Sequence, residues 1–433
     1  MLKIKHSRRK FIGNAALAFA GISIVPRHVL GKGMVAPSDK LNIGFIGTGR
    51  QSAGLGGSFL GLDQVNIVAA SDIYHAKMDI FEKMVNSYYQ KKNNSNDWKG
   101  FKTYHNYREI LERADINAVV IVTPDHWHAL PAIEAANAGK HIYCEKPLSH
   151  TVAEGRAMVK AARNNGITFQ TGSMQRSWKD FRHACELVSN GYIGEVQRVV
   201  VSVGDPALPC HLQVDEKPDD FDWEKWVGPA PIRGFSNVLA PPPSDQGWPM
   251  WRAYREYGGG ILCDWGAHMF DIAQWALGMD NSGPVNYIVP KEANTTRGLK
   301  MIYGNGIEMV HEDFGRGWGV QFFGTEGQLN VSRDYLDSNP KNIVKEKIKD
   351  SDKRLYLSDN HYQNFVDCIK SGERPVCDVE IGHRSASVCN LANIAYQLHT
   401  DLEWDPVAEV FIGNKAANAL LTKQYRKGYE IPV

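Results

Sequence analysis

The sequence has no CxxC pair, no excess of charge of one sign, and no apolar run long enough to span a bilayer comfortably. Its seven cysteines lie far apart, so we expect mostly free, buried thiols and no disulfide framework. Lys and Arg number 49 against 48 Asp and Glu, which argues against a general nucleic-acid binder. With 43% hydrophobic and 22% charged residues, a disordered or collagen-like chain is excluded. The length of 433 residues predicts two or three domains of about 150 residues each.

Residues 1–33 contain seven Lys and Arg and no Asp or Glu, so their formal charge is +7. Because the whole chain has a formal charge of +1, the other residues carry −6. The basic start and the apolar residues 11–25 after it are typical of an export signal. Residues 7–12, Ser-Arg-Arg-Lys-Phe-Ile, resemble the twin-arginine signal, whose machinery exports folded proteins. We therefore expect a periplasmic protein with that export machinery as a partner. A basic amphipathic or disordered tail is the alternative, and the lack of a clean A-x-A cleavage site leaves membrane anchoring open.

Strand-like apolar runs alternate with helical segments over residues 38–167. A helix expected at residues 127–138, for example, ends at Gly139. Such alternation favours an α/β domain with a doubly wound, parallel sheet. The expected strands are residues 41–46, 65–70, 118–123 and 141–144.

A glycine-containing turn follows the first expected strand. Gly47 permits a sharp turn, and Gly49 lets backbone N–H groups approach a pyrophosphate at a helix N-terminus. The third position of the usual fingerprint is Ser52, which is small enough to keep helix and strand close. Asp72 lies about 20 residues further on, where a carboxylate accepts from ribose hydroxyls and repels a 2′-phosphate. The sequence thus predicts a dinucleotide site that prefers NAD to NADP, and an ordinary turn is the alternative for Asp72.

Reactive side chains also follow the third and fourth expected strands. Thr123, Pro124 and His128 lie where open α/β sheets bind ligands, beyond the carboxyl ends of the strands. Glu145 and Lys146 precede a proline, which keeps the lysine out of the helical region and in an extended turn. For His128 the alternative is a surface residue that starts the next helix.

The second half, residues 168–433, loses the alternation and shows strand-like runs joined by short Gly- and Asn-rich loops. Such loops are hairpin signals, so we expect a largely antiparallel sheet here. The stretch 205–255 is rich in Pro and Trp and too long for an ordinary connection. We interpret it as a cap over a site, with a surface excursion as the alternative.

Residues 258–271 carry the densest signal of the second half. Glycines 258–260 allow a close backbone approach, and the segment after them is predicted to be helical as far as residue 277. Asp264 and His268 are four residues apart and so share one face of that helix. A carboxylate beside an imidazole can orient the ring and raise its basicity, which makes the pair a candidate for acid–base chemistry. An N-cap aspartate and a packed histidine are the alternative.

The order of three motifs resembles the Gfo/Idh/MocA oxidoreductases over residues 38–433. The motifs are the glycine turn, Glu-Lys-Pro at 145–147, and Gly-Gly followed by Asp-x-x-x-His at 259–268. The resemblance implies an N-terminal Rossmann domain and a C-terminal α/β domain with an open antiparallel sheet. It also implies that Lys146 bonds the reacting hydroxyl near a nicotinamide, that His268 exchanges the hydroxyl proton, and that Asp264 orients that exchange. Motifs and resemblance together give a candidate cofactor site of Gly47, Gly49, Arg50, Gln51, Ser52, Asp72, Thr123, Pro124, His128, Glu145 and Lys146.

The resemblance predicts an NAD-dependent oxidoreductase that acts on a secondary hydroxyl of a sugar, glycoside or polyol by hydride transfer. Export to a compartment without a free nicotinamide pool favours an enzyme that keeps its NAD tightly bound. The open sheet face, which often packs against another subunit in this family, implies a homo-oligomer.

Candidate substrate contacts are Trp251, which can stack on a sugar ring, and the arginines Arg176 and Arg233. Surface ion pairs are the alternative for the two arginines. Core packing is the alternative for every tryptophan of the cap that can stack in this way, namely Trp223, Trp226, Trp248 and Trp251.

Two other functions stay open. Some members of the family cleave glycosides by NAD-dependent oxidation, elimination, hydration and reduction, although their characteristic His-Gly run is not found here. A non-catalytic sugar sensor on the same fold is the second, and the intact catalytic set argues against it. No metal site is predicted, because Cys210, His211 and His311 lack a convincing ligand spacing.

Overall fold

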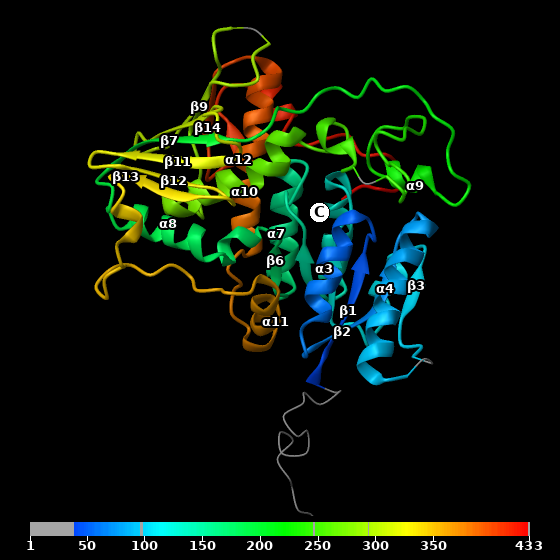
Figure 1. Cartoon of the computed structure of the whole chain (residues 1–433). Coiled ribbons are helices and arrows are strands. Elements are labelled where there is room, and N and C mark those ends of the chain that lie inside the picture. The colour runs from blue at the N-terminus through cyan, green and yellow to red at the C-terminus, as the bar shows by residue number, and fades with distance from the viewer. Residues whose placement is uncertain (1–38, 96–97, 246, 293, 432–433) are drawn as a thin grey trace, which may run out of the picture.

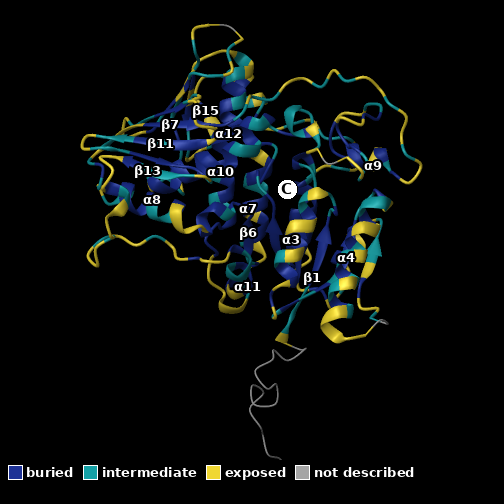
Figure 2. Cartoon of the chain, viewed as in Figure 1, coloured by how far each residue is buried: buried dark blue, intermediate teal, exposed yellow. Residues whose placement is uncertain are grey.

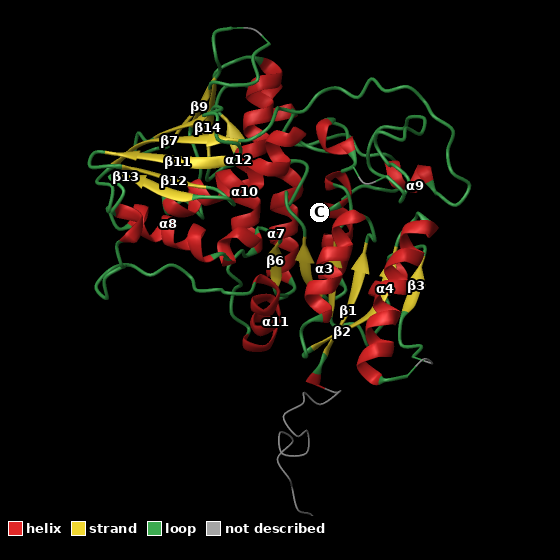
Figure 3. Cartoon of the chain, viewed as in Figure 1, coloured by secondary structure: helices red, strands yellow, loops and turns green. Residues whose placement is uncertain are grey.

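The computed structural model describes residues 39–95, 98–245, 247–292 and 294–431, which form two β-sheets with helices packed on them (Figure 1, Figure 3). The predicted export signal at residues 1–33 lies outside the described residues. Within the described part, no helix is both long and apolar enough to cross a membrane.

The first sheet has the strand order β3-β2-β1-β4-β5-β6, and its neighbouring strands are all parallel. Its central strands are continuous apolar runs buried on both faces, as a sheet covered by helices on two sides requires. The predicted doubly wound sheet is therefore confirmed. The strand order reverses between β1 and β4, the place where such sheets bind ligands. The strands are β1 (Leu41–Ile46), β2 (Val65–Ser71), β3 (Lys102–Tyr104), β4 (Ala118–Ile121), β5 (His141–Cys144) and β6 (Phe169–Thr171).

Helices cover both faces of this sheet. One apolar cluster packs strand residues such as Phe45 against α3, α4 and a helix of the second half, α11, whose Phe365 ring lies 6.3 Å from that of Phe59. A second cluster packs the other face against α5, α6 and α7. The helices are α3 (Arg50–Leu60), α4 (His75–Asn93), α5 (Arg108–Leu111), α6 (Ala129–Asn137), α7 (Val152–Asn164) and α11 (His361–Ser371), with a short 3-10 turn, η2 (Asp125–Trp127), before α6.

The parallel sheet extends past residue 167, where the sequence analysis ends the first domain. Residues 169–171 form β6 and pair with β5. Three residues are too few for an apolar periodicity to reveal a strand.

The second sheet has nine strands in the order β13-β12-β11-β7-β10-β9-β8-β14-β15. Its neighbouring strands are antiparallel except for the pair β7 and β10, so the expectation of a largely antiparallel sheet is confirmed. The strands are β7 (Val196–Ser202), β8 (Asn286–Ile288), β9 (Leu299–Ile302), β10 (Glu308–His311), β11 (Gly319–Gly324), β12 (Gln328–Val331), β13 (Leu336–Asn339), β14 (Leu402–Asp405) and β15 (Val410–Phe411).

Two long helices connect the two sheets. α12 packs against α7 of the first domain and against α10, and α10 in turn packs on β7 and β11 of the second sheet. Both helices are mostly buried, as Figure 2 shows. The remaining elements are α8 (Lys179–Ser189), α9 (Trp223–Val227), α10 (Gly260–Ala276), α12 (Val379–Leu398), α13 (Lys415–Ala419) and the 3-10 turns η3 (Met174–Ser177), η4 (Met250–Ala253) and η5 (Ile343–Lys345).

The segment between β7 and α10, residues 203–259, reaches from the second sheet to the first domain (Figure 1). Its Phe221 stacks on Tyr74, which follows β2, with ring centroids 4.6 Å apart. The segment has an apolar cluster of its own, which includes Trp223, Trp226 and Trp251. These aromatic contacts fix the segment over the carboxyl edge of the parallel sheet.

Candidate active site

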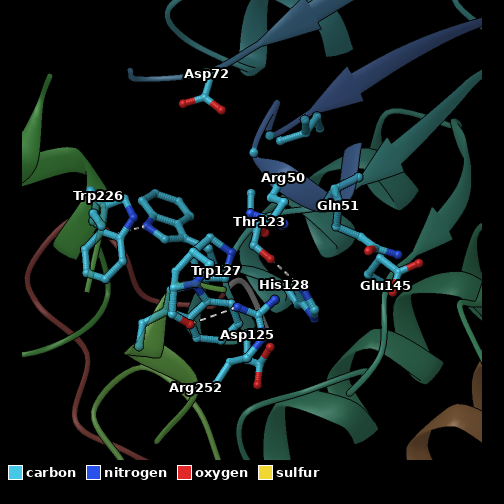
Figure 4. Close-up of a pocket in the computed structure, with 18 of the residues that line it drawn as sticks. Arg50, Gln51, Asp72, Thr123, Asp125, Trp127, His128, Glu145, Trp226 and Arg252 are labelled. Carbon is cyan, nitrogen blue, oxygen red and sulfur yellow. Dashed lines mark hydrogen bonds between the residues drawn. The ribbon is translucent and has the colours of Figure 1, made fainter. Parts of the chain in front are cut away.

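A cavity of about 550 Å³ lies at the carboxyl ends of β1, β2, β4 and β5 (Figure 4). Residues of α10 and of the segment before it complete the wall, which confirms the prediction of a cap. Trp226, Trp248 and Trp251 line the cavity. Trp223 is not among the lining residues, because it stacks behind Trp226 with ring centroids 4.6 Å apart.

The glycine turn lies at one end of the cavity. Gly47 has a φ of +94°, and a Cβ there would lie 2.8 Å from the carbonyl oxygen of Val122, so only glycine fits. Gly49 precedes α3, whose N-terminus has no side-chain cap, and no atom lies within 4 Å of a Cβ built on Gly49. The free N–H groups and the open space fit a phosphate at this helix end.

The three residues after Gly49 divide into two kinds. Arg50 and Gln51 line the cavity and are drawn in Figure 4. Ser52 is buried and is not among the lining residues. Its Oγ donates to the carbonyl oxygen of Gly49 at 2.5 Å, so it holds the shape of the turn. Ser52 thus supports the turn, and its contact with a cofactor stays a prediction.

Asp72 lines the cavity at the end of β2 and is held in place by hydrogen bonds. Its Oδ2 accepts from the backbone N and the Oγ1 of Thr48, at 2.6 and 2.9 Å. Its Oδ1 accepts from the backbone N of Tyr74 at 2.9 Å. The carboxylate thus ties the glycine turn to the second strand while it borders the cavity.

Buried polar atoms without a partner point to a ligand in this cavity. Oγ1 of Thr123 and Oε1 of Glu145 are buried and have no hydrogen-bond partner in the described residues, and both residues line the cavity. Such atoms are rare unless a ligand or water satisfies them. Together with the glycine turn and Asp72, these two residues fit a dinucleotide.

His128 and Pro124 also line the cavity, and His128 connects its two central loops. The ring nitrogens of His128 lie 2.8 Å from the carbonyl oxygen of Pro147 and 3.0 Å from that of Thr123. Burial lowers the pKa of His128 to about 4, so the ring is neutral at physiological pH. The residue positions the Thr123 and Glu145 loops and is no plain surface histidine.

Lys146 makes the central ion pair of the site. Its Nζ donates to Oδ1 of Asp264 at 2.7 Å and to the backbone oxygen of the same residue at 2.9 Å. Arg252 lies on the other side of that carboxylate, with its Nε 3.4 Å from Oδ1. Burial alone would raise the pKa of Asp264, but the two cations outweigh it and hold that pKa below its ordinary value. Asp264 is therefore a stable counter-ion.

The expected contact between Asp264 and His268 is not formed. Both residues are on α10, as predicted, but no hydrogen bond joins them. Asp264 pairs with Lys146 and Arg252 from other elements, because a cation is a stronger partner for a carboxylate than a neutral imidazole. Nε2 of His268 instead lies 3.1 Å from Nη2 of Arg333, and its buried Nδ1 has no partner among the described residues. Burial, followed by the charges of Lys146 and Arg333, holds the pKa of His268 well below its ordinary value.

Sequence reasoning missed several titratable residues of this site, among them Arg252, Arg333 and Asp125. Arg333 follows β12 and carries no motif, so only the fold brings it to His268. Asp125 lies inside the predicted Thr123–His128 region but was not singled out. It lines the cavity, it is 4% exposed, and burial together with the charge of Asp264 raises its pKa to about 8. Burial similarly raises the pKa of Glu145 to about 7.

Two of the three predicted substrate residues lie elsewhere. Trp251 lines the cavity. Arg176 is 1% exposed and donates two hydrogen bonds to Asp271, at 2.8 and 2.9 Å, and two to Asp280. Arg233 donates to the backbone oxygens of residues 210 and 212 inside the cap. Both arginines hold the fold together, and the sequence could not show this because their partners are distant along the chain.

Comparison with known proteins identifies the class. Residues 41–173 match the description "Oxidoreductase family, NAD-binding Rossmann fold", and residues 207–431 match "Oxidoreductase family, C-terminal alpha/beta domain". The chain therefore belongs to the Gfo/Idh/MocA oxidoreductase family.

Individual relatives are more distant. The chain is 23% identical to the myo-inositol 2-dehydrogenase of Thermotoga maritima over 302 residues, which are 65% of this chain and 78% of that protein. It is 36% identical to a glycosyl hydrolase family 109 protein of a Shewanella species over 220 residues, 49% of this chain and 45% of that protein. Two uncharacterized oxidoreductases, from Streptococcus pneumoniae and Bacillus subtilis, are matched over only 32% and 38% of their lengths.

Among solved structures, the WlbA dehydrogenase of Bordetella pertussis, in complex with NADH and UDP-GlcNAcA, superposes with a TM-score of 0.59. The sequence identity is 16%, and the match covers 84% of this chain and 98% of that one. At this identity the likeness concerns the fold alone.

Proposed function

We propose that the protein is an NAD-dependent oxidoreductase that oxidises a secondary hydroxyl of a sugar, glycoside or polyol by transfer of hydride from the carbon that bears the hydroxyl. The observation that carries the proposal is the ion pair of Lys146 and Asp264 at the wall of a cavity that also contains the glycine turn. The inositol dehydrogenase relative supports the choice of substrate class.

Residues of the first domain would hold the cofactor. The N-terminus of α3 with Gly47 and Gly49 would take the pyrophosphate, Asp72 the adenosine ribose, and Thr123 and Glu145 the nicotinamide end. The carboxylate of Asp72 would repel a 2′-phosphate, which supports NAD over NADP. When bound, the nicotinamide supplies the hydride acceptor, and the protein supplies alignment and proton transfer.

Lys146 and His268 divide the proton chemistry between them. The ammonium of Lys146, oriented by Asp264, would donate to the substrate oxygen and stabilise the charge that develops on it. His268 is neutral because its pKa is low, so its Nε2 can accept the hydroxyl proton once Arg333 has moved away. Asp264 acts on Lys146 and does not orient the imidazole, in contrast to the expectation from the sequence.

Substitution of the two reacting residues tests this assignment. We expect Lys146→Met and His268→Ala to abolish reduction of NAD by a panel of sugars and polyols while NAD binding, measured by calorimetry, stays intact. Lys300→Met serves as the control, because Lys300 forms only a half-exposed ion pair on the second sheet. Turnover that survives in both active-site variants would remove the assignment, whereas binding of sugar and NAD without any turnover in the wild type would favour a sugar sensor.

Glycoside cleavage is the second candidate, and the family 109 relative is the observation that favours it. Incubation with nitrophenyl glycosides separates the two functions. Release of nitrophenol without net NADH indicates cleavage, whereas NADH without nitrophenol indicates a dehydrogenase.

The resemblance of residues 7–12 to a twin-arginine signal supports export to the periplasm with the cofactor already loaded. The cap supports retention, because the guanidinium of Arg50 donates to the carbonyl oxygen of Gly247 at 3.3 Å and lies 5.1 Å over the ring of Trp248. Mass spectrometry of protein purified from the periplasm should find bound NAD. Protein without nucleotide, active only with added NAD, would contradict this part of the proposal.

We also propose a homo-oligomer assembled through the second sheet, as the family resemblance implies. Light scattering of the purified protein should give a mass that is a multiple of the monomer mass of 48.4 kDa. A monomer at micromolar concentration would contradict it.

A further inference from the structure

Arg333 is a cation at the cavity wall for which the described residues provide no carboxylate partner. Its Nε is buried and has no hydrogen-bond partner, and its Nη2 contacts only the uncharged ring of His268. The other guanidinium beside the catalytic ion pair, that of Arg252, lies 3.4 Å from a carboxylate oxygen of Asp264. A buried donor without a partner is costly, so its presence at a binding cavity points to a ligand group.

Two tryptophans hold this guanidinium in place. Its carbon lies 4.4 Å from the ring centroid of Trp265 and 5.5 Å from that of Trp178. Burial lowers the pKa of Arg333, yet arginine remains protonated in any case. The aromatic contacts therefore position a permanent cation with one edge toward His268.

The Nε–Nη2 edge of other arginines in this chain binds carboxylates. Nε and Nη2 of Arg176 donate to the two oxygens of Asp271 at 2.8 and 2.9 Å, and the same two atoms of Arg108 donate to Glu134 at 2.9 and 2.7 Å. The two parallel donors match the two oxygens of a planar carboxylate. In Arg333 the Nη2 of this edge contacts an imidazole, and the buried Nε has no hydrogen-bond partner among the described residues.

The contact between Arg333 and His268 also occupies the nitrogen that would accept the hydroxyl proton. A guanidinium can only donate, so Nε2 of His268 must accept, and its lone pair is not free for a hydroxyl proton. A ligand carboxylate that takes the Nε–Nη2 edge of Arg333 would release this lone pair. Binding of the ligand carboxylate to Arg333 would thus also free His268 to act as the base.

The surrounding charges favour an anion as well. Lys146, Arg252 and Arg333 place three cations around this end of the cavity. The ionised carboxylate of Asp264 is shared by Lys146 and Arg252, which leaves Arg333 without one. Of the two other carboxyl groups of this wall, Asp125 has a pKa raised to about 8 and is mostly protonated at neutral pH, and Glu145 has a pKa raised to about 7 and is about half ionised.

We propose that the substrate is an acidic sugar, a uronate or aldonate, whose carboxylate binds the Nε–Nη2 edge of Arg333 next to the reacting hydroxyl. The inference rests on the proposed oxidoreductase function and specifies its substrate class. A neutral sugar or polyol would leave Arg333 on His268 and react slowly, whereas the corresponding acid frees the base.

Matched pairs of sugars test the proposal on the full-length protein with NAD. Glucose with glucuronate, galactose with galacturonate, and glucitol with gluconate differ chiefly in the carboxylate. We expect at least one acid to exceed its neutral partner by about tenfold or more in kcat/KM. Arg333→Gln should remove that preference, because the carboxylate of the acid loses its partner while His268 is free for either sugar, and Arg333→Lys should restore part of it. Arg198→Gln, at a half-exposed ion pair on β7, is the control and should keep the wild-type preference.

Equal rates for acids and neutral sugars in the wild type would overturn the proposal. An equal loss on both kinds of sugar in Arg333→Gln would also overturn it, because Arg333 would then act through His268 alone. If no sugar reduces NAD, the proposed function fails, and calorimetric binding of the same pairs still decides the role of Arg333. Binding of an acid that is tighter than that of its neutral partner, and that depends on Arg333, supports the anion site; binding without that difference contradicts it.

Discussion

The ammonium of Lys146 is bound twice by Asp264, at 2.7 Å through its carboxylate and at 2.9 Å through its backbone oxygen. These residues are 118 positions apart and come from the two halves of the chain. The turn after β5 and the first turns of α10 therefore meet at one charge pair. The amine of Lys146 lies where the Rossmann domain and the C-terminal domain meet.

Loss of this pair should destabilise the protein. In Asp264→Asn the cations of Lys146 and Arg252 lose their counter-ion in a mostly buried site, where removal of one partner costs about 3 kcal/mol or more. Urea denaturation measures the loss. Asp337→Asn breaks a half-exposed pair with Arg316 and should cost about 1 kcal/mol or less. Equal losses of unfolding free energy in the two variants would show that the buried ion pair stabilises the protein no more than the exposed one.

The raised pKa of Asp125 predicts a pH dependence of stability. Its pKa rises from 3.8 to about 8 on folding, so the folded state favours the protonated form. The stability that this proton contributes is complete below about pH 4 and is lost as the pH rises through about 8. Asp125→Asn should therefore lose less stability between about pH 5 and about pH 9 than the wild type, by at least about 1.4 kcal/mol.

Urea denaturation at the two pH values measures the difference. Asp219→Asn, a change at an exposed aspartate of the cap, is the control and should follow the wild type. A parallel pH dependence of Asp125→Asn and the wild type would show that Asp125 is ionised in the fold.

The buried arginine Arg176 should matter for stability and not for substrate. Arg176→Met leaves the carboxylates of Asp271 and Asp280 without their cation, which should cost about 3–5 kcal/mol. The KM for the sugar should stay unchanged, because the side chain does not line the cavity. A raised KM at unchanged stability would show instead that Arg176 contacts the substrate.

The glycine turn should be the most sensitive backbone position for the cofactor. Gly47→Ala places a Cβ in a left-handed conformation 2.8 Å from a carbonyl oxygen, so the turn must shift. We expect NAD affinity to fall by about tenfold or more in calorimetry. Gly54→Ala, on the exposed face of α3 with open space around it, should keep NAD affinity and stabilise the helix by up to about 1 kcal/mol. Comparable loss of affinity in both variants would contradict a special role for Gly47.

Features that are local in sequence could be predicted. The buried strands of the first sheet are continuous apolar runs, and the turn at Gly47 follows one of them directly, so their pattern indicates both fold and nucleotide site. Lys146 and His268 were found because motifs carry them. Their neighbours in the site come from elements that are distant along the chain, and only the structure shows them.

Features made by tertiary contacts could not be predicted. The short β6 has too few residues for a pattern, and Arg333 reaches His268 only because β12 ends beside α10. The sequence equally cannot show that Asp264 prefers Lys146 to the histidine on its own helix. The role of Arg176 could not be predicted for the same reason. Its charge suggests a ligand contact, but in the structure it is buried with two aspartates in the core.

The central claim is transfer of hydride from a carbinol carbon of the substrate to NAD beside Lys146. The most direct test uses the best substrate of the sugar and polyol panel, deuterated at its ring carbons, with mass spectrometry of the cofactor after a single turnover. The account predicts that the reduced cofactor carries one deuterium, and that Lys146→Met binds NAD but transfers none. A cofactor that stays oxidised, or that gains only solvent hydrogen, would contradict it.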